Sequence, residues 1–271
     1  MPELPEVEYT RRQLHRAMAR ASIERVVTHR ANLRYPFPSD FARIQGQLVR
    51  GISRRAKYLL LEFAAGDVLL MHLGMSGSFR FARGAYDAHV YEAHDHVVFE
   101  MSNGNVVIFN DPRRFGFMTL LDADEANAHA PLARLGPEPL ARRFDVAALA
   151  QELRRRKTSL KIALSDQRVI AGLGNIYVSE ALHRAGLSPK RRASTLVTKS
   201  GEPRPALHDL VKAIRETLKA AIRNQYRMGA DDPFLVYDHQ GQRCPRRGCS
   251  GTIRRIVQGG RSTFYCPVCQ R

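Results

Sequence analysis

The segment Cys244-Pro-Arg-Arg-Gly-Cys249, together with Cys266-Pro-Val-Cys269, decides the fold of the end of this chain. Two close cysteine pairs separated by a hairpin-sized insert are typical of a structural zinc site. Four thiolates close a tetrahedron around Zn²⁺ and leave no open position for chemistry. The alternative interpretation is that the four are unrelated core cysteines. The spacing favours a zinc ribbon over residues 236–271 that binds one structural zinc ion.

The insert between the cysteine pairs has the pattern of a β-hairpin. Residues 252–257 and 262–265 have the composition of strands, and Gly259-Gly260 supplies the tight turn between them. Arg261 therefore lies at the tip of the predicted hairpin, where a guanidinium can reach a phosphate group. A solvated turn arginine is an equally simple interpretation of this residue.

The chain as a whole is strongly basic. Its 271 residues include 43 lysines and arginines against 26 acidic residues, which gives a net charge of +17. Such an excess indicates a polyanionic partner, with nucleic acid as the first candidate. A merely basic protein would have the same balance.

The sequence shows no sign of a signal peptide or a membrane span, so we expect an intracellular protein. No apolar run approaches the roughly 20 residues that a membrane span needs. Glu3, Glu6 and Glu8 make the start acidic, which is the opposite of a signal peptide. In a reducing compartment, cysteines bind metal more often than they form disulfides.

The first half of the chain predicts a β-sandwich with a flanking helix. Residues 3–20 carry Val7, Leu14 and Met18 on one helical face. Short apolar runs punctuated by glycine and asparagine then continue to about residue 121 and predict two packed sheets. The clearest of these predicted strands are residues 58–63, 68–73, 96–99 and 106–109.

The second half has helical periodicity and begins after a stiff stretch. Gly136-Pro137-Glu138-Pro139 cannot be helical and predicts a hinge within residues 135–150. We therefore expect an α+β multidomain protein: a sandwich domain (1–134), a hinge, a helical domain (151–235) and the ribbon. The predicted helices are residues 144–156, 161–170, 175–185 and 205–223.

The first residues carry a chemical signal of their own. Removal of Met1 would leave Pro2 as a secondary amine, which can attack a sugar C1′ and form an iminium ion without needing a proton. That cation is an electron sink that promotes elimination of the flanking phosphates. The neighbouring carboxylate of Glu3 can move protons at the sugar ring oxygen.

Six separate motifs, spread over essentially the whole chain, resemble the formamidopyrimidine-DNA glycosylase family of bifunctional 8-oxoguanine DNA glycosylase/AP lyases. The resemblance implies a sandwich domain, a helical domain with a helix–two-turns–helix motif and a zinc ribbon, with DNA in a basic cleft between the domains. The motifs are PELPEVE (2–8), RRAKYLL (54–60), HLGMSG (72–77), NDPRRFG (110–116), GLGNIY (172–177) and GRSTFYC (260–266).

Three residues would fill the gap that a flipped base leaves in the DNA stack. An enzyme that acts on a base must extrude it, and apolar side chains can wedge between base steps. By resemblance, Met75 and Phe115 are these wedges, and Arg113 donates hydrogen bonds to the orphaned partner base. Without the resemblance, Met75 and Phe115 would more simply be core side chains.

The resemblance also assigns phosphate and other DNA contacts. Lys57 would be a catalytic lysine near the lesion, whereas a lone lysine there is usually a surface residue. Asn175 and Arg261 would anchor a phosphate beside the lesion; alone, Asn175 would be an ordinary N-cap. Three further residues match DNA-contacting positions: His72, His94 and Lys157.

The chain departs from the family pattern in two places. The first cysteine pair is spaced x4 rather than the usual x2, a spacing that zinc ribbons tolerate. The segment 224–235 is shorter than usual and lacks the glycine-containing loop that folds over the flipped base. A weaker preference for 8-oxoguanine, with ring-opened formamidopyrimidine or abasic-site processing retained, is the corresponding hypothesis.

The sequence thus predicts a glycosylase/AP lyase that removes oxidised purines from double-stranded DNA through Pro2. We expect a bacterial-type, cytoplasmic, nucleoid-associated monomer without an organic cofactor. Two alternatives stay open: an endonuclease VIII-like enzyme for oxidised pyrimidines, and a non-catalytic zinc-ribbon DNA-binding protein. The Arg113-Arg114-Phe115 loop favours the purine branch over the former.

Overall fold

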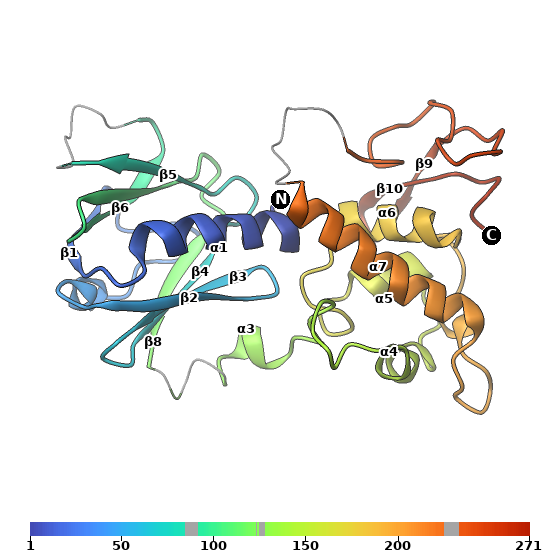
Figure 1. The fold of residues 1–271 in the computed structure, drawn as a ribbon, viewed down its shortest axis with the longest axis horizontal. Coiled ribbons are helices and arrows are strands. Elements are labelled where there is room, and N and C mark those ends of the chain that lie inside the picture. Colours follow the sequence, from blue (N-terminus) through green and yellow to red (C-terminus); the bar gives the residue numbers. More distant parts are fainter. Residues whose placement is uncertain (85–91, 123, 125–127, 225–232) are drawn as a thin grey trace. The chain divides into compact units, whose positions relative to one another are not determined.

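A computed structural model describes residues 1–84, 92–122, 124, 128–224 and 233–271 of the chain. The chain divides into two compact units, residues 1–133 and 134–271 (Figure 1). Among the described residues, no helix is both long and apolar enough to cross a membrane.

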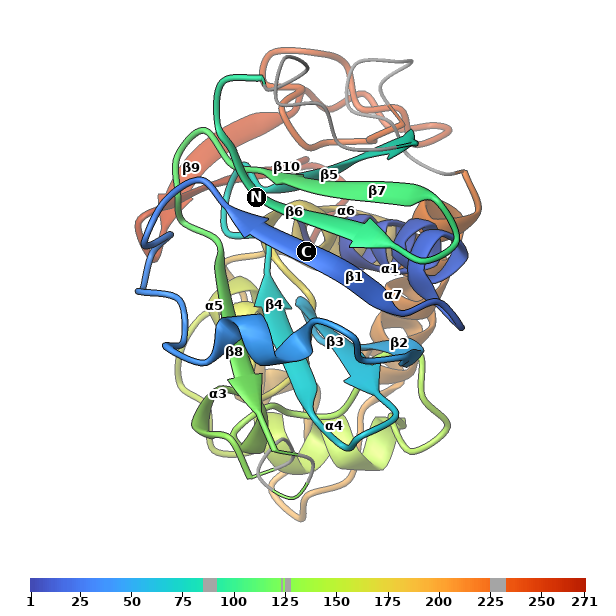
Figure 2. The same ribbon diagram turned by 90° about the vertical axis from the view of Figure 1, so that its left-hand side faces the viewer.

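The first unit is a sandwich of two four-stranded antiparallel sheets. The strand orders are β1-β6-β7-β5 and β2-β3-β4-β8, and Figure 2 shows the two sheets as separate layers. The strands are β1 (Ile23–Thr28), β2 (Val49–Arg55), β3 (Tyr58–Phe63), β4 (Val68–His72), β5 (Ser78–Arg83), β6 (Asp95–Met101), β7 (Asn105–Asn110) and β8 (Phe117–Leu121).

The core of this unit lies between the sheets and under helix α1 (Leu4–Met18). Strand β3 alternates buried and half-buried side chains, as expected for a strand with one face on the core. Helix α1 contacts β2 and β3 of one sheet and β5 and β7 of the other. Its apolar face, with Val7, Leu14 and Met18, is buried in the same cluster as the strands. The predicted β-sandwich with a flanking helix is confirmed.

The second unit contains the helices and the ribbon. Its α-helices are α4 (Val146–Leu153), α5 (Leu160–Ser165), α6 (Asn175–Ala185) and α7 (Pro205–Arg223), and the short α3 (Ala130–Ala133) precedes it. The predicted bounds of α6 and α7 are correct, because Gly174 and Gly186 flank the first helix and Pro205 starts the second.

Helix α5 is shorter than predicted. It ends at Ser165, whereas the sequence pattern continues to residue 170. The side chain of Asp166 accepts the backbone N–H of Arg168 at 3.0 Å, an alternative to the helical hydrogen bond. Gln167 then binds Gly172 and the carbonyl of Leu173 through its side chain, so the chain turns instead of continuing the helix.

The ribbon contains the predicted hairpin, with β9 (Arg254–Gln258) and β10 (Arg261–Tyr265) paired in antiparallel register. Gly259 and Gly260 form its turn, and both have left-handed backbones with φ of 57° and 72°. Glycine adopts this conformation without steric cost, as two-residue hairpin turns require.

Candidate functional site

The start of the chain is held by the first turn of α1. Glu3 is the N-cap residue and is 2% exposed. It forms a capping box with Glu6, whose carboxylate accepts the Glu3 N–H at 2.8 Å. Pro5 fits the first turn because the N–H that it lacks would have no helical partner there. Pro2 therefore directly precedes a carboxylate fixed at the positive end of a helix.

Lys57 lies in the tight turn between β2 and β3. Ala56 has a left-handed backbone, with φ of 53°, and Arg54 donates to its carbonyl oxygen at 2.9 Å. Lys57 is 6% exposed, so the alternative of a surface lysine is wrong. The Lys57 side chain is therefore packed against its surroundings rather than free in solvent.

Glu8 connects this turn to helix α1. Its carboxylate accepts hydrogen bonds from the guanidinium groups of Arg11, Arg12 and Arg54. Burial raises the pKa of Glu8, but the hydrogen bonds from Arg11 and Arg12 outweigh this and hold the pKa below its ordinary value. The ionised Glu8 thus ties the helix that begins with Glu3 to the turn that carries Lys57.

His72, at the end of β4, is held as a neutral imidazole. Burial, followed by the positive charges of Lys57 and Arg34, lowers the pKa of His72 to about 4. Its Nδ1 accepts the N–H of Gly74 at 3.0 Å, so Nε2 carries the proton. The ring stacks on Phe117, with centroids 5.6 Å apart. His72 therefore presents a neutral N–H donor close to Lys57.

Two loops after β4 and β7, residues 73–77 and 111–116, are fastened together by buried Asp111. One carboxylate oxygen accepts the hydroxyl of Ser76 at 2.5 Å, and the other accepts the N–H of Gly116 at 2.8 Å. The Ser76 oxygen in turn accepts the N–H of Arg113 at 3.1 Å. Gly74 packs so closely on the backbone of the other loop that a Cβ there would overlap it.

This loop pair presents Met75, Arg113 and Phe115 to solvent. Met75 is 43% exposed and Phe115 is 42% exposed, so the alternative that they are core residues is wrong. The guanidinium carbon of Arg113 lies 4.9 Å from the centre of the Phe115 ring. His94 is also exposed, and its carbonyl oxygen accepts the Asp111 N–H at 3.1 Å.

In the second unit, Asn175 joins helix α6 to the ribbon hairpin. The N-cap of α6 is Gly174, and Asn175 is the first helical residue, so the ordinary N-cap alternative is wrong. The amide of Asn175 donates to the carbonyl of Ser262 at 2.8 Å, next to Arg261. Its other amide atom, Oδ1, is buried and has no hydrogen-bond partner among the described residues.

The hairpin tip that carries Arg261 is fastened to helix α5. Lys161, 2% exposed, donates to the carbonyl of Gln258 at 3.4 Å, and the Gln258 amide donates to Ser159 at 3.1 Å. Arg261 itself is exposed, as is Lys157 in the turn before α5. Both cations are therefore accessible on a braced scaffold.

The four cysteines form one zinc site. Their four Sγ atoms all lie within 4.8 Å of one another. The Sγ atoms of Cys244 and Cys269 are 3.7 Å apart, and those of Cys249 and Cys266 are 3.6 Å apart. The edge of a tetrahedron with Zn–S bonds of about 2.3 Å is about 3.8 Å, so the sulfurs fit a tetrahedral zinc ion.

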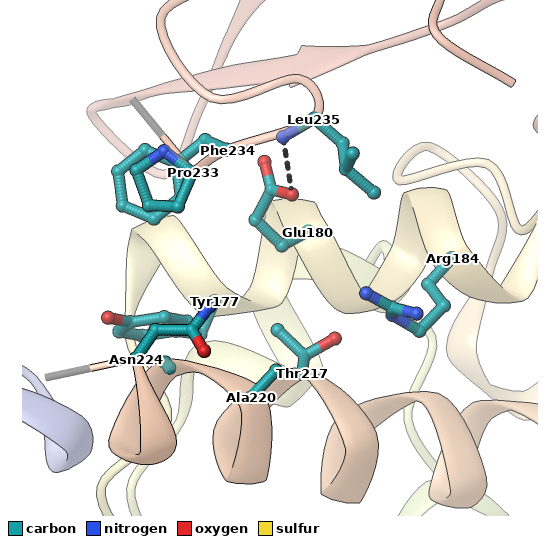
Figure 3. A pocket seen from close by; sticks show the side chains of 10 residues that line it. Tyr177, Glu180, Arg184, Thr217, Ala220, Asn224, Pro233, Phe234 and Leu235 are labelled. Atoms are coloured by element: carbon teal, nitrogen blue, oxygen red, sulfur yellow. Dashed lines mark hydrogen bonds between the residues drawn. The ribbon is translucent and has the colours of Figure 1, made fainter. Parts of the chain in front are cut away.

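Glu180 is a buried carboxylate that the sequence analysis did not name. It lies on α6, is 5% exposed, and accepts the consecutive backbone N–H groups of Leu235, Val236 and Tyr237 at 2.8–2.9 Å. Figure 3 shows it beside Tyr177 in a small pocket of about 90 Å³, between α6, α7 and residues 233–235. The sequence could have indicated this residue, because a glutamate among the apolar residues of a predicted helix must find buried hydrogen-bond donors.

The candidate residues thus fall into two groups. The first unit brings together Met75, Arg113 and Phe115, and places Lys57 close to His72. It also contains Pro2, Glu3 and His94. The second unit places Asn175 against the strand that begins with Arg261, with Lys157 and the zinc cysteines elsewhere in the same unit.

Comparisons with known families match all three parts of the chain. Residues 1–118 match the family described as formamidopyrimidine-DNA glycosylase N-terminal domain, and residues 135–230 match its H2TH domain. Residues 241–271 match the zinc finger found in FPG and IleRS. A curated relative from Afipia carboxidovorans, named formamidopyrimidine-DNA glycosylase, is 52% identical over 294 positions and is covered completely, as is this chain.

Solved structures are also similar over the full length of both chains. Lactococcus lactis formamidopyrimidine-DNA glycosylase, bound non-covalently to DNA with an AP site, has a TM-score of 0.86 and 31% identity. A structure of MutM with DNA containing carbocyclic 8-oxo-G has a TM-score of 0.85 and 32% identity. Both complexes contain damaged DNA.

Proposed function

This chain belongs to the formamidopyrimidine-DNA glycosylase family, and from this we infer that it is a base-excision repair enzyme. It is a bifunctional glycosylase and AP lyase that removes oxidised purines from double-stranded DNA. The relatives point to this family rather than to an endonuclease VIII-like or a non-catalytic protein. The observation that carries the proposal is the exposed group of Met75, Arg113 and Phe115 on braced loops, which suits the filling of a gap in a base stack.

In the proposed reaction, Pro2 is the nucleophile once Met1 has been removed. Its secondary amine forms a bond to C1′ as the bond from C1′ to the damaged base breaks, and the base leaves with a proton. The lone pair of the Pro2 nitrogen then breaks the C1′–O4′ bond, O4′ takes a proton, and the open-chain iminium forms. Loss of a C2′ proton gives an enamine whose electron pair expels the 3′ phosphate, and loss of a C4′ proton then expels the 5′ phosphate. Glu3, fixed at the start of α1, donates a proton at the sugar ring oxygen.

The cations and neutral donors of both units hold the DNA backbone. Lys57 and Arg261 bind phosphates beside the lesion, and Lys57 also serves in proton transfer. His72 contributes a neutral N–H donor, because its lowered pKa keeps it uncharged at neutral pH. The remaining proposed contacts are His94, Lys157 and Asn175. The net charge of +17 supports binding that weakens as salt rises.

We extend the proposal to the organisation of the chain. Residues 1–134 act as the catalytic domain, 135–150 as the linker, 151–235 as the helical DNA-binding domain and 236–271 as the zinc finger. The protein acts as a monomer on chromosomal DNA in the cytoplasm. The family matches and the pattern of the sequence support the domain assignments.

The lesion preference rests on the segment 224–235. Most of this segment, residues 225–232, lies outside the described residues. The alignment with the Afipia protein spans 294 positions, more than the 271 residues of this chain, so the relative has residues that this chain lacks. We propose that formamidopyrimidine and abasic sites are processed better than 8-oxoguanine.

Borohydride trapping tests the reaction. Mature protein, with loss of Met1 verified by intact mass, is mixed with duplexes that contain 8-oxoguanine, formamidopyrimidine or an abasic site. A covalent complex that disappears when an N-terminal extension blocks Pro2 is the expected result. Trapping only on the latter two duplexes supports the proposed lesion preference. No trapping on any duplex, with DNA binding retained, would leave a non-catalytic DNA-binding protein.

A further inference from the structure

One zinc cysteine has a neighbour from outside the ribbon. His183 lies in the last turn of α6 and is 2% exposed. Its Nε2 lies 3.3 Å from the Sγ of Cys244. A zinc-bound thiolate has no proton and can only accept a hydrogen bond, so Nε2 carries the proton. In the part of the chain that the structure describes, the other ring nitrogen, Nδ1, is buried without a hydrogen-bond partner.

The unusual spacer of the first cysteine pair holds this contact in place. Arg246, one of the four residues between Cys244 and Cys249, donates through its guanidinium to the carbonyl oxygens of His183 and Arg184. These are carbonyls of the last helical turn, which a cation stabilises. The x4 spacing thus supplies the arginine that caps the helix bearing the imidazole.

The end of α6 is joined to the ribbon at further points. The N–H of Arg271 donates to the carbonyl of Gly186 at 3.0 Å, and the Gln270 amide donates to the carbonyl of Leu187 at 2.9 Å. A Cβ on Gly186 would lie 3.4 Å from the carbonyl oxygen of Cys269. These contacts hold the end of α6 against the ribbon, so the position of the His183 imidazole beside the Cys244 sulfur is fixed by the backbone.

A donor at this position has a chemical consequence for the metal site. Zinc with four thiolates carries a net negative charge, which makes the sulfurs targets for protons, oxidants and competing metals. A hydrogen bond to a ligand orients it and tunes its basicity, and loss of such a partner typically costs about 10–100-fold in metal affinity.

We propose that His183 is a positioning residue of the zinc site, whose Nε2–H hydrogen bond to the Cys244 thiolate slows loss of the metal. It also joins the metal to α6, the helix whose first residue, Asn175, binds the carbonyl next to Arg261. Helix α6 therefore contacts both a zinc ligand and the strand that begins at the hairpin tip. The proposal rests on the zinc site and is independent of the reaction assigned to Pro2.

The test is the rate of zinc transfer from the full-length protein to an excess of chromogenic chelator. His183→Phe keeps an aromatic ring without a donor, and His183→Gln keeps an N–H. The matched control is His208→Phe, at an exposed histidine on α7. We expect release from His183→Phe to be about tenfold faster or more, an intermediate rate for His183→Gln, and no change for the control.

Two outcomes would overturn the proposal. Equal rates for the wild type and His183→Phe would show that the contact does not affect the metal. Equal acceleration by Phe and Gln would show that the imidazole acts through its volume alone. If His183→Phe does not fold, His183→Leu takes its place. Cobalt-loaded protein gives a second readout, because loss of the donor should shift the thiolate-to-cobalt absorption to lower energy.

Discussion

Two regions of the molecule present an arginine on a tight turn, and they are held in different ways. The loop pair around Arg113 is fastened by one buried carboxylate, Asp111, at the end of a large sandwich core. The tip around Arg261 belongs to a ribbon whose own buried cluster is small, and half of its buried residues are cysteines. A short segment cannot bury enough apolar surface to be stable alone, so a metal takes the place of the core.

Removal of zinc should separate the two regions most clearly. Structural zinc contributes about 10–16 kcal/mol in small zinc modules, so a strong chelator should unfold the ribbon and leave the sandwich intact. Hydrogen exchange of the full-length protein should show lost protection in residues 236–271 and unchanged protection in residues 1–133. Restored protection on adding zinc is the control. Equal loss in both regions would mean that the sandwich also depends on the metal.

A methyl group at Gly74 should damage the loop pair and spare the ribbon. In Gly74→Ala the new Cβ overlaps the backbone of Phe115 and Gly116, so the loops must move apart. A displacement of about 1 Å near a reacting site can cost about 100-fold in rate, which single-turnover excision would detect. Gly104→Ala is the matched control, because Gly104 also has a left-handed backbone (φ of 76°), but no atom of the described residues lies within 4 Å of a new Cβ there. Equal effects of both variants would assign the loss to backbone strain alone.

Asp111→Asn should weaken the same brace by a smaller amount. The amide has one acceptor oxygen, so either the Ser76 hydroxyl or the Gly116 N–H loses its partner. A buried unsatisfied group costs about 1–3 kcal/mol, which urea unfolding would measure. The control is Asp145→Asn at the exposed N-cap of α4. Aspartate and asparagine cap equally well, so the free energy of unfolding should not change. A neutral Asp111→Asn would show that the carboxylate does not hold the loops.

A pH dependence from His72 should be the most gradual effect. The folded-state pKa of His72 is about 4, below its ordinary value of 6.5, so the unfolded chain binds the proton more tightly. Above pH 6.5 His72 is neutral in both states and does not reduce the free energy of unfolding. As the pH falls from 6.5 towards 4, the free energy of unfolding decreases by on the order of 1 kcal/mol per pH unit. Thermal unfolding of the wild type should lose more stability over this range than His72→Gln. Parallel curves would contradict the lowered pKa.

The sequence predicted the elements best where local signals agree. Glycines flank α6, Pro205 begins α7, and Gly259-Gly260 marks the hairpin turn, so all three were placed correctly. The prediction for α5 was wrong at its end, because the side chain of Asp166 competes for the backbone, a choice that periodicity does not reveal.

For the candidate site, the sequence identified residue types but not their surroundings. The four zinc ligands follow from spacing alone, since metal chemistry restricts both the ligand type and the separation. The exposure of Met75 and Phe115, the burial of Lys57 and the place of Asn175 after its N-cap all contradict what local pattern would suggest. Asp111, Glu180 and His183 were given no role of their own, because each binds a segment distant in sequence.

The sequence by itself determined the sandwich class of the first unit, helices α6 and α7, the zinc ligands and the basic charge of this protein, because these depend on periodicity, turn residues and composition over short stretches. Only the tertiary structure decided which polar groups are buried and what they hold. A buried carboxylate or imidazole is stable only when partners from other segments satisfy it, and those partners meet only once the chain has folded.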